Sequence, residues 1–540
     1  MSASNKKQLR KGKNAAILTE KQQAQVKEEK KMRLYTGLFV AVIAVVLCAA
    51  IAIGVTNAIN RSGVIQRNTT AVTIGSRDVS SAELNYYFVD AVNAANNSWK
   101  QQYGDYASLY LQMMGLDLSQ PLNTQNYMGN EEMTWADYFA QTAVENARSS
   151  YALYDLAVAE GRQLTAEETA SIDQALQVMA YYANASSMSN AESYLKAVYG
   201  NGATEKSYRQ YCEISALASS YYNAHRDSLT YDDDALRAYE SGRELEYNSY
   251  SYSYYYLASS RFLTGGTTDA DGNTTYTDEE KAASLTAAKA AADSLSNVTS
   301  AEEFDNAIAA LEINADSETA ASTPCKNVLY DSVSASMREW VTDSSRKAGD
   351  MAVLPNETTS SDGSTDTIGY YVVLFQGSTD NKTPLVNVRH ILVSFTADDE
   401  ESKKTALDKL ELLQSEWQQG EATAESFGEL ASLNSEDTGS ASNGGLYENV
   451  YPGQMVDTFN DWCFDESRQV GDTGIVETTY GYHLMYFAGW QDTTYRDYMI
   501  KNDLLTEDMN NWYSSVLENV TAGELNSSKL SMSMIISSAS

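Results

Sequence analysis

The pattern of apolar and polar positions divides the chain into stretches of different period. From residue 78 onward, apolar and aromatic residues recur at the three- and four-residue spacing of amphipathic helices. Thr165 and Glu168 form a capping box, and Asn190 and Gly200 bracket a shorter helix. Residues 78–246 are therefore predicted to form a helical domain. Its aromatic positions favour a helix–helix core, and the alternative is an exposed groove for unfolded peptides.

Strands replace helices further along the chain. Four tyrosines alternate with other residues at the two-residue period of a strand, namely Tyr250, Tyr252, Tyr254 and Tyr256. A loop, GGTTDADGNTT, and a capping box of Thr277 and Glu280 then precede an Ala-rich helix. The stretch VNVRHILVSF, at 386–395, is typical of a buried strand, yet it contains His390. Residues 491–540 are predicted to be a helix with a Ser-rich tail.

An uncharged apolar run from Leu34 to Val55 is long enough for a helix to cross a bilayer. The preceding tail, residues 1–33, holds ten Lys or Arg against three Glu, and such basic flanks keep a terminus in the cytoplasm. We therefore predict a transmembrane anchor at 34–57, followed at 58–77 by a linker and a short strand that begins the piece AVTIGSRDVS at Ala71. The remaining chain then lies outside the cytoplasm. A cleaved signal peptide is the alternative, although the basic tail and the apolar run are both longer than the corresponding regions of a signal peptide.

Charge and cysteine content narrow the classes of function. The net charge of −35 disfavours nucleic-acid binding, because that binding depends on Lys and Arg neutralising phosphates. The excess of acidic residues indicates a solvated protein surface that keeps the protein soluble. Cys212, Cys325 and Cys463 are far apart and lack metal-ligand spacing. They are therefore interpreted as small buried hydrophobic residues rather than as disulfides or metal ligands.

An internal repeat organises the second half of the chain. EWVTDSSRKAGD is similar to DWCFDESRQVGD, and Trp340, Asp343, Arg346, Gly349 and Asp350 each recur 122 positions later. Three further pairs of blocks match: YYYLAS with RHILVS, AEEF with AESF, and GYYVVLF with GYHLMYF. Ordered blocks of this kind indicate two copies of one α/β domain. In this alignment Tyr255 stands at His390 and Tyr371 at His483, so only the second copy holds two of the chain's three histidines.

At these residues the second copy resembles a parvulin-type peptidyl-prolyl cis/trans isomerase. The motifs are VNVRHILVSF, FGELASLNSEDTGSASNGG, PGQMVDTF and GIVETTYGYHLMYF. The whole chain is similar to membrane-anchored extracytoplasmic folding factors of the PrsA/SurA type. The resemblance implies an α+β fold class, with antiparallel sheets and flanking helices in two parvulin-like domains after the transmembrane helix. The implied domains are a chaperone-like helical domain at 78–246, a degenerate parvulin-like domain at 247–378, a prolyl isomerase domain at 386–490, and the C-terminal helix and tail.

The resemblance also assigns roles to individual residues. The implied catalytic residues are His390, His483 and Asp437, and the implied substrate-binding residues are Met455, Phe459 and Thr478. The histidines would pair on neighbouring central strands, with the carboxylate beside the rotating carbonyl. No metal or cofactor is implied, since the reaction is rotation about one amide bond. The family's GGDLG-aromatic segment is replaced by GGLYENVYPGQM, with one extra residue, so Tyr447 to Tyr451 receive no role.

The implied function is an extracytoplasmic prolyl isomerase and folding chaperone, held at the cell membrane by a single pass. Its partners would be unfolded or nascent secreted polypeptides with X–Pro bonds, and the membrane through one N-terminal helix, but no nucleic acid. A non-catalytic holdase with a vestigial parvulin domain is the alternative. A surface adhesin is a third hypothesis, and the absence of wall-anchor signals argues against it. His390 with His483 favours the enzyme over the holdase.

The predicted topology is open to a direct test. Protease added to intact cells should digest the chain beyond about residue 60 and spare the tail before Leu34, because basic residues hold that tail inside. Immunoblotting with antibodies against each part measures the outcome, with permeabilised cells as the control. Protection of residues 386–490 in intact cells would contradict the topology.

Overall fold

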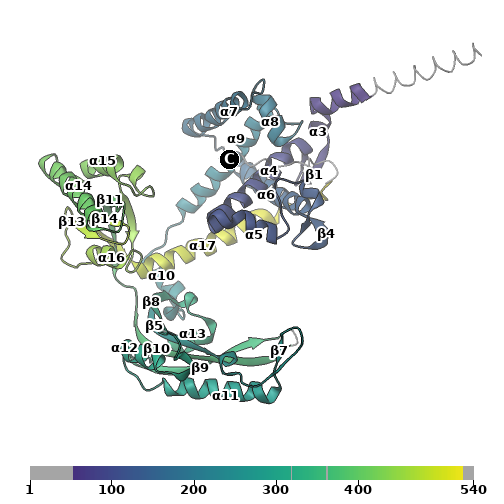
Figure 1. The fold of residues 1–540 in the computed structure, drawn as a ribbon. Helices are drawn as coiled ribbons and strands as arrows, with labels where there is room; N and C mark the ends of the chain where they lie inside the picture. The colour runs from purple at the N-terminus through teal and green to yellow at the C-terminus, as the bar shows by residue number, and fades with distance from the viewer. Residues whose placement is uncertain (1–52, 318, 361–362, 527–540) are drawn as a thin grey trace, which may run out of the picture. The chain divides into compact units, whose positions relative to one another are not determined.

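A computed structural model describes residues 53–317, 319–360 and 363–526 (Figure 1). Two compact units divide the chain, one formed by residues up to 229 and from 509 onward, and the other by residues 230–508. The tail at 1–33 and most of the predicted anchor at 34–57 lie outside the described residues. Among the residues that the structure describes, none of the helices combines the length and the apolar character needed to traverse a bilayer.

The first unit is mainly helical, as the periodicity predicts. Its longer helices are α4 (Ser81–Tyr103), α6 (Trp135–Ala159), α7 (Ala166–Ala185) and α9 (Glu205–Ser228), with the shorter α5 (Ala107–Met113) and α8 (Ala191–Tyr199). Short hairpins precede α4 and α6: β1 (Thr70–Ile74) with β2 (Arg77–Ser80), and β3 (Asn126–Tyr127) with β4 (Asn130–Thr134). The predicted capping box of Thr165 with Glu168 is present, and Asn190 caps α8. Aromatic residues of α4, α6 and α9 pack in one core, so the helix–helix interpretation of these positions is confirmed.

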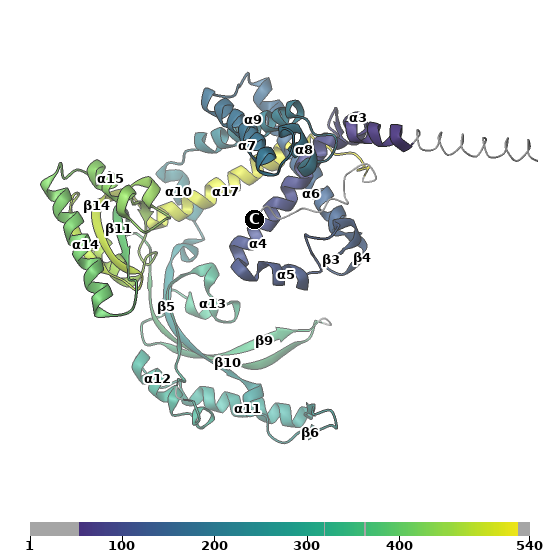
Figure 2. The ribbon, with the colours of Figure 1, turned by 45° about the horizontal axis from the view of Figure 1, so that its top comes forward.

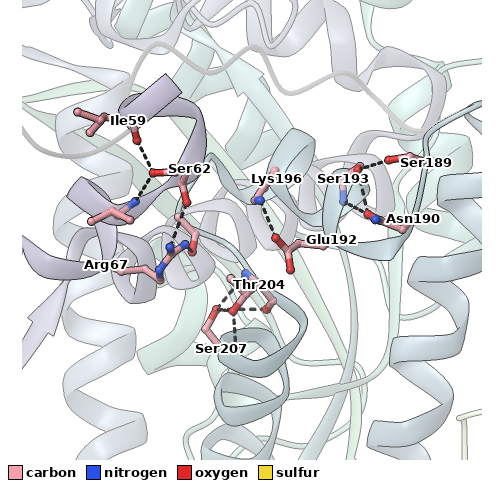
Figure 3. A network of polar contacts seen from close by, with 12 residues as sticks. Ile59, Ser62, Arg67, Ser189, Asn190, Glu192, Ser193, Lys196, Thr204 and Ser207 are labelled. Carbon is pink, nitrogen blue, oxygen red and sulfur yellow. Dashed lines mark hydrogen bonds and ion pairs between the residues drawn. The ribbon is translucent and has the colours of Figure 1, made fainter. Parts of the chain in front are cut away.

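The segment predicted as a linker at 58–77 is instead ordered. Residues 53–62 are helical, and α3 (Val64–Asn68) leads into the β1–β2 hairpin, so AVTIGSRDVS forms two strands rather than one. Polar side chains there hydrogen-bond to the backbone, as Ser62 does to the Ile59 carbonyl and Asn68 to the Val64 carbonyl, which the composition does not reveal. The guanidinium of Arg67 donates to the carbonyls of Gly202 and Ser62, at 3.3 and 3.0 Å, next to the capped start of α9 (Figure 3).

The second unit contains two four-stranded antiparallel sheets. The first has the order β8 (Thr323–Leu329), β5 (Ser249–Ala258), β10 (Thr365–Thr379), β9 (Met351–Thr359). The second has the order β12 (Leu446–Val450), β11 (Pro384–Ser394), β14 (Gly481–Thr494), β13 (Thr473–Glu477). In each sheet the first and last strands in sequence lie side by side at the centre. The two sheets therefore have the same strand topology.

Helices cover both faces of each sheet. On the first sheet α11 (Asp278–Ser294) and α12 (Ala301–Ala309) lie on one face and α13 (Ala335–Val341) on the other (Figure 2). On the second sheet α14 (Glu400–Gln419) and α15 (Ala424–Asn434) pack on one face, and α16 (Asp457–Cys463) on the opposite face. The GGTTDADGNTT loop contains two-residue strands, β6 (Thr267–Thr268) and β7 (Thr274–Thr275). Outside the sheets, α10 (Asp233–Glu240) precedes β5, and α17 (Tyr495–Glu518) follows β14.

The register of the strands corrects the sequence alignment by one residue. His390 lies opposite Met485, and the equivalent pair in the first sheet is Tyr254 with Val373. Tyr254, and not Tyr255, therefore occupies the place of His390, because a shift of one residue moves a side chain to the other face. Its ring contacts Tyr371, with centroids 5.7 Å apart. The first sheet thus carries two tyrosines where the second carries two histidines.

Candidate active site

Two buried histidines meet on the central strands of the second sheet. His390 lies on β11, and His483 lies on β14 opposite Leu392. Both side chains point to the face covered by α16, where they are 3% and 6% exposed. Their Nδ1 atoms are 3.0 Å apart, within hydrogen-bond distance. The sheet itself thus sets the geometry of the pair.

Asp437 extends this pair from the loop between α15 and β12. The loop is fixed to β11, because Glu436 donates its N–H to the Leu392 carbonyl at 2.9 Å. Asp437 Oδ2 consequently lies 2.9 Å from His390 Nε2. Gly445 closes the loop with φ +68°, and a Cβ there would lie 2.1 Å from the His390 carbonyl oxygen. A glycine is therefore required where the loop returns to the strand.

Thr478 completes the other end of the row. It follows β13, and its N–H donates to the Gly481 carbonyl at 2.9 Å, which closes the turn into β14. Its Oγ1 lies 2.9 Å from His483 Nε2. The sequence-predicted residues Asp437, His390, His483 and Thr478 therefore form one continuous row of hydrogen bonds across the sheet.

The electrostatics favour neutral imidazoles beside an ionised carboxylate. Burial lowers the pKa of His390, and burial together with the neighbouring ring lowers the pKa of His483 to about 4. Burial alone would raise the pKa of Asp437. Hydrogen bonds from Ser440, Tyr447 and His390 outweigh that effect and lower the pKa of Asp437 to about 2.

These charge states leave one consistent direction for the hydrogen bonds. An ionised Asp437 only accepts, so His390 donates from Nε2–H and presents a bare Nδ1. His483 must then donate from Nδ1–H, which leaves its Nε2 to accept from the Thr478 hydroxyl. The opposite direction would place a lone pair of His390 against the carboxylate. The row is therefore polar but carries its charge only at Asp437.

An apolar wall lies against the two rings. Phe459 of α16 meets both imidazoles edge-on, with centroid distances of 5.5 and 5.4 Å to His390 and His483. Phe459 is 3% exposed, and the half-buried Met455 packs into the same cluster. The predicted wall is thus assembled, but Phe459 lies beneath the surface, whereas Met455 is partly accessible.

A cleft of about 1110 Å³ opens beside Thr478. It runs between the loop after β11, the start of α16 and the end of β13, and includes Phe395, Ala397, Val456 and Thr478 in its lining. Val456 is 38% exposed, whereas Met455 and Phe459 do not line the cleft. Within the part of the chain that the structure describes, no three His, Cys, Asp or Glu side chains converge as metal ligands do.

Ser440 and Tyr447 also belong to the row, although the sequence assigned neither of them a role. Both hydroxyls donate to Asp437 Oδ2, and the Tyr447 bond measures 2.9 Å. Ser440 lies three residues after Asp437, a spacing at which a hydroxyl can reach back across a turn. Tyr447 gives no such local signal, because strand pairing brings it to the site.

Comparisons with known proteins agree with this geometry. A family model described as the PPIC-type PPIASE domain matches residues 370–488. Foldase protein PrsA 1 of Listeria innocua is 37% identical over 102 residues, covering 19% of this chain and 30% of that protein. Foldase protein PrsA 3 of Bacillus cereus is 36% identical over 107 residues, covering 20% and 32%. The match thus spans about a third of the length of these relatives.

Solved structures give a more limited similarity. The PrsA peptidylprolyl isomerase of Bacillus anthracis matches 26% of this chain and 59% of its own, at 26% identity and a TM-score of 0.17. PrsA of Bacillus subtilis matches 25% and 47%, at 28% identity and a TM-score of 0.17. The sequence matches are sufficient to place a parvulin-class domain in the chain and to support its resemblance to the PrsA foldases.

The lowered pKa of His483 predicts a dependence of stability on pH. Between its unfolded pKa of about 6.5 and its folded pKa of about 4, the unfolded chain binds a proton that the folded chain excludes. Stability should therefore fall by about 3 kcal/mol as pH drops through this window. Asp437 loses its own contribution only at lower pH, between about 3.9 and about 2.

Urea unfolding at several pH values, followed by tryptophan fluorescence, measures this slope. His483→Asn should make the slope shallower, because only His390, whose pKa burial also lowers, then remains in the row to be protonated. His225→Asn is the matched control, since His225 lies outside the row, stacked on Trp512. An unchanged slope in His483→Asn would show that His483 does not carry the pH dependence.

Proposed function

We propose that this chain, which carries a PPIC-type domain at 370–488, is an extracytoplasmic peptidyl-prolyl cis/trans isomerase and folding chaperone. Its substrates are unfolded or nascent secreted polypeptides with X–Pro bonds. The observation that carries the proposal is the buried row of Asp437, His390 and His483, which ends at a cleft beside Thr478. The relatives named PrsA are foldases, which agrees with this activity.

The chemistry follows from the barrier to amide rotation. Partial double-bond character opposes rotation by about 18–20 kcal/mol, and the barrier falls when the site favours the twisted amide over the planar one. We assign His390, His483 and Asp437 to a fixed polar surface beside the rotating amide. Neutral imidazoles held rigidly stabilise a twisted amide without first losing water. No group needs to attack the substrate.

Apolar contacts supply the rest of the proposed site. Met455 and Phe459 would receive the proline ring, with Phe459 as the buried support and Met455 as the accessible surface. Thr478 lines the cleft and bonds to His483, so it joins the polar row to the bound peptide. A pocket that fits the ring excludes water from the amide, and each ~1.4 kcal/mol of preference for the twisted form gives about tenfold in rate.

Substitutions in the two parts of the site should have different effects. Met455→Ala should mainly raise KM, because it removes about 1–3 kcal/mol of apolar contact with the ring. His390→Ala should lower kcat and also the melting temperature, since His483 then keeps an unpaired buried N–H. The measurements are kcat, KM and a melting curve on an X–Pro peptide, with His225→Ala as control. A folded His390→Ala chain that retains full activity would refute catalysis at this row.

A non-catalytic holdase is the second candidate, favoured by exposed apolar side chains on the helical unit. Tyr106, Leu109 and Met113 are 74%, 58% and 79% exposed on and beside α5. Contiguous exposed apolar side chains of this kind mark interaction surfaces. The two candidates differ in one result, because a holdase prevents aggregation of an unfolded client without accelerating X–Pro exchange.

We further propose that residues 247–378 form a degenerate parvulin-like copy. The shared strand topology supports this assignment, together with α13 in the place of α16. Tyr254 and Tyr371 replace the histidines, and Met337 stands where the repeat places Phe459. Phenol groups on these strands cannot form the donor–acceptor row of two imidazoles, so the copy would support binding or spacing rather than catalysis.

The two copies can be compared as separate fragments. Residues 247–378 should fold, because their sheet has its own core on both faces, yet should not accelerate X–Pro exchange. Residues 380–492 serve as the active counterpart in the same assay, and circular dichroism reports the folding of each. Comparable rates from both fragments would show that the histidine pair is not the cause of activity.

Membrane attachment through 34–57 also stays a proposal. Its basis is the uncharged apolar run after a basic tail. In this topology residues 1–33 lie in the cytoplasm. The parts outside the cytoplasm are the helical unit, the two parvulin-like copies and the C-terminal helix. The anchor would hold the isomerase where secreted chains emerge.

A further inference from the structure

Tyr447 contacts two members of the polar row at once. Its hydroxyl donates to Asp437 Oδ2 at 2.9 Å, and its ring stacks on His390 with centroids 5.2 Å apart and planes 29° apart. It lies on β12 opposite Val388, two residues before His390 on the neighbouring strand. Side chains two residues apart on a strand share a face, so Val388, its partner Tyr447 and His390 all lie on one face of the sheet. The phenol ring therefore lies beside the imidazole of His390.

A bulge in β12 is what brings Tyr447 to this position. Val386 pairs with Val450, but Val388 pairs with Tyr447, so β12 uses one residue more than β11 between the same two pairs. Asn449 lies within the bulge with φ 57° and donates its N–H to Asn387 Oδ1 at 2.8 Å. In a regular ladder Glu448 would stand opposite Val388. The extra residue thus exchanges a carboxylate for a phenol beside Asp437.

We propose that Tyr447 is a positioning residue of the isomerase site, which holds Asp437 as a fixed acceptor for His390 Nε2–H and thereby sets the direction of the whole row. This role rests on the proposed function. Three donors then converge on Asp437 Oδ2: the imidazole of His390 and the hydroxyls of Ser440 and Tyr447. A carboxylate bonded on several sides cannot turn away from the histidine without losing all of these bonds.

The environment of the phenol suits this role. Burial, and then its bond to the carboxylate, raise the pKa of Tyr447, so the hydroxyl keeps its proton and remains a donor. Removing the hydroxyl would leave Asp437 with fewer donors and would ease its protonation. A protonated Asp437 can itself donate, and His390 is then free to adopt the other tautomer.

The histidines themselves provide the readout. The full chain contains three histidines, so ¹⁵N-histidine labelling reports on His390, His483 and His225 alone. In the unmodified chain His390 should be protonated on Nε2 and His483 on Nδ1. Tyr447→Phe keeps the stacked ring but removes the donor. It should mix the His390 tautomers, and should move the acid limb of kcat/KM to higher pH, with a loss of about tenfold.

Two further variants complete the design. Tyr447→Leu removes both the ring and the hydroxyl and should lower kcat/KM further. If Tyr447→Phe does not fold, Tyr447→Leu takes its place in the tautomer measurement. Tyr451→Phe is the matched control, because Tyr451 lies just beyond the same strand and stacks instead on Tyr495 at 4.1 Å. It should leave the His390 and His483 signals unchanged.

The outcomes separate this role from the proposed activity. Unchanged histidine signals and an unchanged pH profile in Tyr447→Phe would overturn the positioning role and leave Tyr447 as packing. If the unmodified chain shows no isomerase activity, the proposed function fails, yet the tautomer signals still decide whether Tyr447 sets the direction of the row. Mixed His390 tautomers in Tyr447→Phe, with Tyr451→Phe unchanged, support the role.

Discussion

The hydrogen bond between the Nδ1 atoms of His390 and His483 is the constraint on which the rest of the site depends. It joins two neighbouring strands through their side chains, at 3.0 Å, under the cover of α16. Such a bond requires one ring to donate and the other to accept, so the accepting ring, His390, must keep a bare Nδ1 and stay neutral. Burial meets that condition, since it lowers the pKa of both rings.

A buried polar pair is stable only if its outer atoms are also satisfied. Asp437 and Thr478 serve this purpose at the two ends of the row, and the local structure is arranged to place them there. The 437–445 loop is bonded to β11, and Gly445 lets it approach the His390 carbonyl. The turn after β13 places Thr478 in line with His483. The loop and the turn around the site therefore both serve to hold one hydrogen-bonded row in place.

The sequence predicted the parts of this arrangement that local pattern controls. The alternation of tyrosines marks β5, and the apolar residues on either side of His390 mark β11, because neighbouring residues set both the side-chain period and the burial of a strand. Capping residues predicted α7, α8 and α11 at their N-termini. The six site residues came from resemblance, and the structure brings His390, His483, Asp437, Thr478 and Phe459 into contact, with Met455 in the same apolar cluster.

Features that depend on strand pairing escaped prediction. Tyr255 was aligned with His390, but the register puts Tyr254 there, since pairing across the sheet is not fixed by residues within one strand. Tyr447 was missed for the same reason, because a bulge decides which side chain faces Asp437. The polar residues of 58–77 predict a linker, whereas Ser62, Asn68 and Thr69 among them bond to the helix backbone.

X–Pro rotation is proposed to occur at the row formed by His390 and His483. Exchange spectroscopy on an X–Pro peptide mixed with the ¹⁵N-histidine-labelled full chain tests it in one sample. Uncatalysed exchange takes tens to hundreds of seconds, so cis–trans cross-peaks at sub-second mixing times require catalysis. Such cross-peaks are expected, together with shifts of the His390 and His483 signals and no shift of the His225 signal. Catalysis without those shifts, or binding without exchange, would contradict it.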